Sequence, residues 1–139
     1  MSNIVHLKDL KNWAEENKNA FSFGDVVAVN GEMGFGKTTL IRHLISAFGS
    51  NLEATSPTFA LMDEHTIGSE KIILHIDAYR LKDASEALGL GLDLYNTTTT
   101  LIFIEWSQNI PEYILRPNKV IEISLSDEES ERKINHFSI

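Results

Sequence analysis

Residues 31–38 have the composition and spacing of a phosphate-binding loop. They read Gly-Glu-Met-Gly-Phe-Gly-Lys-Thr, which matches the pattern G-x-x-x-x-G-K-[ST]. Glycines in such a loop let the backbone curl, so that successive N–H groups point at phosphate oxygens. We expect the ammonium of Lys37 to bridge the β- and γ-phosphates of a nucleoside triphosphate and the Thr38 hydroxyl to bind Mg²⁺. The predicted phosphate-binding residues are Gly31, Glu32, Met33, Gly34, Phe35, Gly36, Lys37, Thr38 and Thr39.

Two acidic residues each follow an apolar run that predicts a buried strand. Residues 72–76 precede Asp77, and residues 101–104 precede Glu105. Open α/β sheets bind ligands at the carboxyl ends of their strands. Mg²⁺ bound with a nucleotide usually has a carboxylate ligand besides the loop hydroxyl. The two positions fit this requirement equally well, so one acid is expected to bind the metal and the other to orient water or a partner group.

Three further features are weaker evidence for a functional role. Residues 55–58 read Thr-Ser-Pro-Thr and follow the first helix after the loop, where many nucleotide switches have a segment that senses the γ-phosphate. Taken alone, Ser-Pro predicts only a turn. His75 lies within an apolar run, and we expect a hydrogen-bonded core histidine rather than a catalytic one. Trp106 is expected to be a core or interface aromatic residue.

The pattern around the loop predicts the elements that position it. Residues 26–29 form an apolar, β-branched run that is typical of a buried parallel strand. Apolar residues between 40 and 48 recur at helical spacing, and Gly49 is placed to end that helix. Further predicted elements are helices over 9–19, with Asp9 as N-cap, and 83–88, an extended segment over 58–64, and a hairpin of strands 120–125 and 133–137.

Length and composition limit the class of protein. The 139 residues suit a single domain, 1–139, and 42% of them are apolar, so the chain is expected to fold. Together these features predict an α/β fold: a three-layer P-loop NTPase-like domain whose mostly parallel central sheet is flanked by helices. Cysteine is absent, which excludes disulfides and thiolate metal sites. We find no signal peptide or membrane-spanning stretch, and we expect a cytoplasmic protein.

The charge and the missing motifs narrow the choice of ligand. Twelve basic and 20 acidic residues give a formal net charge of −8. Because such a surface repels phosphate backbones, strong independent binding to nucleic acid is not expected. The guanine-reading pattern N-K-x-D is missing, since Asn118 and Lys119 are followed by Val120 and Ile121. The chain is also short for a nucleoside kinase and lacks an Arg-rich lid segment.

Five pieces of sequence, in this order, resemble the bacterial TsaE (YjeE) family, small ATPases required for the threonylcarbamoyladenosine modification of tRNA. Besides the loop, they are Ser-Pro-Thr-Phe at 56–59, His-Ile-Asp-Ala-Tyr-Arg-Leu at 75–81, Glu-Ala-Leu-Gly-Leu at 86–90, and Glu-Trp at 105–106. The resemblance extends from about residue 26 to residue 125. The family's late basic residue has loose counterparts here in Arg132 or Lys133.

The resemblance implies roles that the residues alone leave open. In the family the acid of the Glu-Trp pair helps to bind Mg²⁺ with the loop threonine, which corresponds to Glu105 and Thr38. Asp77 corresponds to an aspartate needed for ATPase activity, which with Lys37 and Glu105 makes the implied catalytic set. The implied switch segment is Ser56, Pro57 and Thr58.

The resemblance also implies cofactors and partners. The cofactors are ATP/ADP and Mg²⁺, and the partners are TsaB and TsaD, of which TsaD performs the carbamoyl transfer. ATP binding and slow hydrolysis are implied to reset or support that complex. Two other functions remain open: a small-molecule phosphotransferase, and a nucleotide-dependent binding module with negligible hydrolysis.

Overall fold

The fold is described from a computed structural model, for residues 3–32, 34–50 and 61–139. Met33 of the predicted loop lies outside the described residues. So do Ser56, Pro57 and Thr58 of the predicted switch segment.

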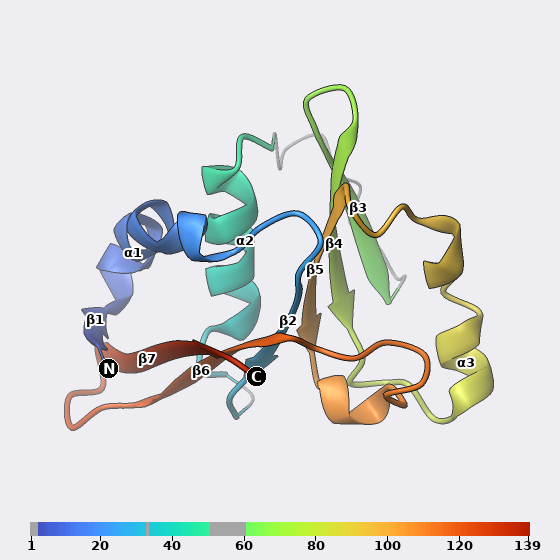
Figure 1. The fold of residues 1–139 in the computed structure, drawn as a ribbon. Coiled ribbons are helices and arrows are strands. Elements are labelled where there is room, and N and C mark those ends of the chain that lie inside the picture. Colours follow the sequence, from blue (N-terminus) through green and yellow to red (C-terminus); the bar gives the residue numbers. More distant parts are fainter. Residues whose placement is uncertain (1–2, 33, 51–60) are drawn as a thin grey trace.

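Seven strands form one mixed sheet in the order β1-β7-β6-β2-β5-β4-β3 (Figure 1). The four inner strands, β6, β2, β5 and β4, are parallel to one another, whereas β3, β7 and β1 are joined to the sheet by antiparallel pairs. The strands are β1 (Asn3–His6), β2 (Val26–Asn30), β3 (Met62–Ile67), β4 (Lys71–Asp77), β5 (Thr100–Glu105), β6 (Lys119–Leu125) and β7 (Glu131–Ser138).

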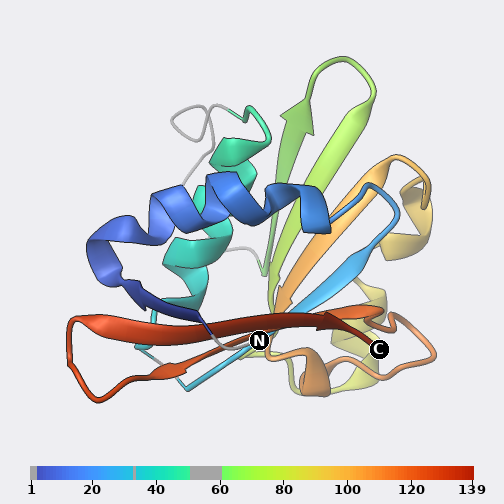
Figure 2. The same ribbon diagram turned by 60° about the vertical axis from the view of Figure 1, so that its left-hand side comes forward.

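Helices cover both faces of the sheet, as Figures 1 and 2 show. The first two α-helices pack on one face and the third on the other. The helices are α1 (Leu10–Asn17), α2 (Lys37–Ala47) and α3 (Ala84–Leu88), with short 3₁₀ turns η1 (Leu7–Asp9), η2 (Lys18–Ala20), η4 (Leu92–Leu94) and η5 (Ser107–Asn109). The predicted three-layer α/β architecture is thereby confirmed. No helix in the described part of the chain has the length and hydrophobicity that crossing a membrane requires.

Two apolar clusters, one on each face, hold the layers together. Every residue of β5 is buried, which explains why residues 101–104 are all apolar instead of alternating with polar residues. Phe103 packs in the cluster under α1 and α2, whereas Ile102 and Ile104 pack in the cluster with α3. The central strands are therefore fixed from both sides, and their carboxyl ends are rigid supports for a site.

The element boundaries differ from the predictions at the edges of the domain. The helix predicted over 9–19 is shorter, because 3₁₀ turns replace both of its ends, and Asp9 takes the N-cap position without a side-chain capping bond. β3 begins at Met62 and overlaps the end of the extended segment predicted over 58–64, of which residues 58–60 lie outside the described residues. The four-residue strand β1 was not predicted, since only its pairing with β7 defines it.

The strand register places the predicted site residues at one edge of the sheet. Asp77 of β4 and Glu105 of β5 are direct neighbours, and Glu105 also pairs with Val29 near the end of β2. The phosphate-binding loop leaves β2 at this same edge and leads into α2. Both acids and the loop therefore meet where the parallel strands end.

Candidate functional site

The glycines of the loop serve two different purposes. Gly34 and Gly36 have φ values of 86° and 100°, in the left-handed region that side chains with a Cβ rarely adopt. Gly36 is also the N-cap of α2, so the helix begins directly at Lys37. Gly31 instead needs space, because a Cβ there would lie 2.5 Å from the carbonyl oxygen of Ile123. The loop is thus curled by two glycines and held close to β6 by the third.

Lys37 is buried, and the described contacts of its ammonium are with uncharged groups. Its Nζ donates a hydrogen bond to the carbonyl oxygen of Gly31 at 2.5 Å and lies 4.0 Å from the centroid of the Trp106 ring. Within the described residues no carboxylate forms an ion pair with it. A buried cation without a counter-ion is costly, so the site has a positive charge available for an anion.

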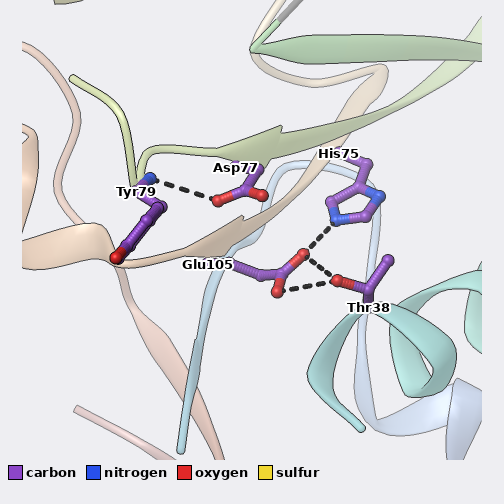
Figure 3. A network of polar contacts seen from close by, with 5 residues as sticks. All are labelled: Thr38, His75, Asp77, Tyr79 and Glu105. Atoms are coloured by element: carbon purple, nitrogen blue, oxygen red, sulfur yellow. Dashed lines mark hydrogen bonds and ion pairs between the residues drawn. The ribbon is translucent and has the colours of Figure 1, made fainter. Parts of the chain in front are cut away.

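Glu105 is a buried carboxylate at the centre of a polar network (Figure 3). The Thr38 hydroxyl donates to its two carboxylate oxygens at 2.9 Å (Oε1) and 2.8 Å (Oε2). On the other side, Nε2 of His75 is 2.7 Å from Oε2. Glu105 is 4% exposed and His75 is 7% exposed. Thr38 and Glu105, the two residues that the resemblance assigns to Mg²⁺, are therefore in direct contact.

Asp77 has a different environment, although it neighbours Glu105 in the sheet. It is exposed, and its Oδ1 accepts a hydrogen bond from the backbone N–H of Tyr79 at 3.1 Å. Figure 3 shows this bond separate from the contacts of Thr38, Glu105 and His75. Strand ends alone did not distinguish the two acids, but Glu105 is the one that contacts the loop.

A cavity of about 330 Å³ brings most of the predicted residues together. Among the described predicted residues, Gly31, Glu32 and Phe35 are not in its lining: Gly31 approaches Ile123 of β6, Glu32 is exposed, and Phe35 packs against the apolar core. The lining residues are Gly34, Gly36, Lys37, Thr38, Thr39, Asp77, Tyr79, Glu105 and Trp106. The cavity therefore combines a cation, hydroxyl groups and two carboxylates at the amino end of α2, where the helix dipole favours an anion.

The oxygen donors of Thr38 and Glu105 suit Mg²⁺, which prefers hard oxygen ligands. No group of three or more His, Asp or Glu side chains with the arrangement of a metal site occurs among the described residues. A pair of protein oxygens fits a magnesium ion that takes its remaining ligands from phosphates and water.

Four residues that the sequence predictions did not assign to the site lie in or beside it: Tyr79 and Trp106 line the cavity, and His75 and Arg132 contact predicted residues. His75 contacts Glu105. Its position two residues before Asp77 could have indicated this, because alternate residues of a strand share a face and His75 therefore lies on the same face as the predicted acid. Trp106 follows Glu105 directly, has a left-handed φ of 61° and lies 5.1 Å from the ring of Tyr79.

The fourth, Arg132, contacts the loop from outside the cavity. It is buried in β7, and its Nε donates to the carbonyl oxygen of Phe35 at 3.2 Å. Lys133, the other counterpart of the family's late basic residue, is exposed. The hairpin of β6 and β7 was predicted and is confirmed, but its position beside β2, which brings Arg132 to the loop, does not follow from local sequence.

A second buried histidine lies on β3, beside the strand that carries His75. His65 is 2% exposed, and its ring Nδ1 lies 3.4 Å from the hydroxyl oxygen of Ser50. Burial lowers its pKa below the usual 6.5; the charge of Asp63 opposes this shift, and those of His75 and Arg42 add to it. His65 is therefore predominantly neutral at neutral pH.

Comparison with known proteins identifies the family of this chain. A family model described as "Threonylcarbamoyl adenosine biosynthesis protein TsaE" matches residues 4–134. The TsaE protein of Haemophilus influenzae is 40% identical over 83 residues, which are 60% of this chain and 52% of that protein. The TsaE protein of Streptomyces coelicolor is 32% identical over 120 residues, which are 84% of this chain and 79% of that protein.

A solved structure has a similar fold. The crystal structure of Bacillus subtilis YdiB matches with a TM-score of 0.70 and 25% sequence identity, over 99% of this chain and 84% of that chain. The match to the Haemophilus protein spans only about half of that protein's length, whereas the family model covers nearly the whole chain. The chain belongs to the TsaE family of threonylcarbamoyl adenosine biosynthesis proteins.

Proposed function

We propose that this protein binds ATP with Mg²⁺ and hydrolyses it slowly, as an accessory subunit in the threonylcarbamoyladenosine modification of tRNA. The observation that carries the proposal is the buried ammonium of Lys37 beside the loop, with a carbonyl and a ring face as its described contacts. A triphosphate would supply the missing negative charge. Loop N–H groups and the amino end of α2 would add to its binding.

Thr38 and Glu105 are the proposed ligands of Mg²⁺, because the two side chains already converge in the cavity. When bound, the ion would neutralise charge that develops on the transferred phosphoryl group. Asp77 lines the same cavity without contacting Thr38, which suits a residue that orients the attacking water. Lys37 would stabilise the phosphate oxygens through the reaction, so charge positioning rather than covalent chemistry carries the mechanism.

The proposed role in tRNA modification rests on family membership and on the names of relatives, which describe tRNA threonylcarbamoyladenosine biosynthesis proteins. The net charge of −8 disfavours direct capture of tRNA. We therefore propose that the protein acts through protein partners of the TsaB and TsaD type, with ADP and phosphate as the products of its own reaction.

Reconstitution tests this proposal. The purified protein is mixed with TsaB- and TsaD-type subunits, tRNA and ATP, and both modified nucleoside and released phosphate are measured. We expect modification to depend on the protein, and Lys37→Ala to remove that dependence together with phosphate release. Binding and modification without phosphate release would instead identify a nucleotide-dependent binding module. Modification that proceeds equally with Lys37→Ala would contradict the proposal.

One observation favours a small-molecule phosphotransferase as the second candidate. A larger cavity, of about 880 Å³, shares Gly31, Lys37 and Trp106 with the loop region and extends along polar residues that include Ser107 and Gln108. Such a volume could hold an acceptor molecule next to the phosphates. Incubation with ATP and a panel of nucleosides and sugars tests this candidate. Stoichiometric phosphorylated product supports it, whereas free inorganic phosphate as the only product, with no phosphorylated acceptor, excludes it.

A further inference from the structure

His75 and Glu105 form the most buried side-chain contact of the site, and the mechanism above does not use it. The two residues come from neighbouring parallel strands and are not paired across the sheet, since His75 pairs with Phe103. The imidazole therefore reaches along the sheet toward the strand end to meet the carboxylate, at 2.7 Å. Paired and alternate residues place His75, Phe103 and Glu105 on the face that α2 covers.

The contact has a defined direction. An ionised carboxylate only accepts hydrogen bonds, so Nε2 of His75 must carry the hydrogen. His75 thereby occupies Oε2 of Glu105, while Oε1 is contacted, among the described residues, only by the hydroxyl of Thr38. The two oxygens of this carboxylate are thus made unequal by the protein before any ligand is present.

From this geometry we infer that His75 is a positioning residue, which fixes the orientation of Glu105 for Mg²⁺. The inference rests on the proposed function. Two described side chains, those of Thr38 and His75, form hydrogen-bond contacts with the Glu105 carboxylate, and Thr38 is itself a proposed metal ligand. A hydroxyl oxygen that binds a cation is a weaker anchor for Glu105, whereas the imidazole contact does not have to change. Partners of this kind orient the ligands in many metal sites.

The chain offers a matched control in His65. It is also a buried histidine, on the strand next to that of His75, and it pairs with Ile73 two positions before His75. Its described polar contact is with Ser50, outside the cavity. Replacing either histidine by leucine removes a buried imidazole from the same region, but only the change at His75 removes a contact of Glu105.

The experiment measures the affinity for ADP by calorimetry, with Mg²⁺ and with EDTA, in the wild type, His75→Leu, His75→Gln and His65→Leu. We expect His75→Leu to lower the gain in affinity that Mg²⁺ gives by about 10-fold or more, and to change the affinity in EDTA by less than about 3-fold. His75→Gln should restore most of the gain, because its amide N–H can donate to Glu105. His65→Leu should behave like the wild type.

Two results would overturn the inference: a gain from Mg²⁺ in His75→Leu equal to that in His65→Leu, or an equal loss of affinity with and without Mg²⁺, which indicates a merely structural role. If His75→Leu does not fold, His75→Asn replaces it, since this amide is one methylene shorter than that of His75→Gln and should lose the gain. A wild type that shows no gain from Mg²⁺ would instead refute the proposed function, and the inference with it.

Discussion

At the level of single residues, the site keeps a buried cation and a buried carboxylate apart. Among the described residues, Lys37 and Glu105 form no ion pair, because Glu105 is occupied by Thr38 and His75. Lys37 is held by the carbonyl oxygen of Gly31 and by the ring of Trp106. Its charge is therefore available to phosphate oxygens without first breaking a salt bridge.

Asp77 allows a test that separates binding from turnover. Because it lines the cavity without contacting Thr38, Asp77→Asn should change the affinity for MgATP by less than about 3-fold. Loss of the group that orients water should lower the rate of phosphate release on the order of 100-fold. Asp93→Asn, at an exposed aspartate outside this cavity, is the matched control and should alter neither quantity. Equal losses of affinity and rate in Asp77→Asn would show that Asp77 acts in binding.

His65 predicts a pH dependence of stability. Since its folded pKa is below 6.5, the unfolded chain takes up the proton first as the pH falls. The free energy of unfolding should therefore decrease as the pH falls from about 6.5 toward the lower folded pKa, and this contribution should become constant below it. Urea titrations of the wild type and His65→Gln between pH 7.5 and pH 5 measure the difference, with a shallower decrease expected for His65→Gln. Identical profiles would contradict it.

At the level of elements, the loop depends on how closely β2 and β6 approach. Gly31→Ala would place a methyl group 2.5 Å from a backbone carbonyl, which no change of side-chain rotamer can relieve. We expect a loss of about 1–3 kcal/mol in the free energy of unfolding, measured by urea titration. Gly89→Ala is the comparison, because its φ of −65° is ordinary and its closest contact is 3.3 Å. A smaller loss for Gly31→Ala than for Gly89→Ala would contradict this role.

The elements also show which features local sequence could predict. The central strands and α2 were predicted well, because their apolar patterns are set by burial on both faces or on one. The predicted residues of the cavity followed from one loop and two strand ends. By contrast, β1 and the contact of Arg132 with the loop depend on pairing between distant parts of the chain. The partner of His75 depends on the order of β4 and β5 in the sheet.

At the level of the whole molecule, strands from both ends of the described chain belong to one sheet. The first strand, β1, forms one edge of this sheet and pairs with β7. We propose that residues 1–139 form a single domain. Unfolding should then be one cooperative transition, with coincident curves from far-UV circular dichroism and from tryptophan fluorescence, which reports Trp13 in the core and Trp106 at the site. Two separated transitions would contradict a single domain.

The central claim is that the loop at residues 31–38 binds a nucleoside triphosphate through the ammonium of Lys37, and calorimetric titration with MgATP tests it most directly. We predict saturable binding at one site in the wild type and a loss of affinity of at least about 100-fold, equivalent to about 2.7 kcal/mol, in Lys37→Ala, with the melting temperature of the variant preserved. Binding of MgATP to Lys37→Ala with wild-type affinity, or no binding to the wild type, would contradict the account.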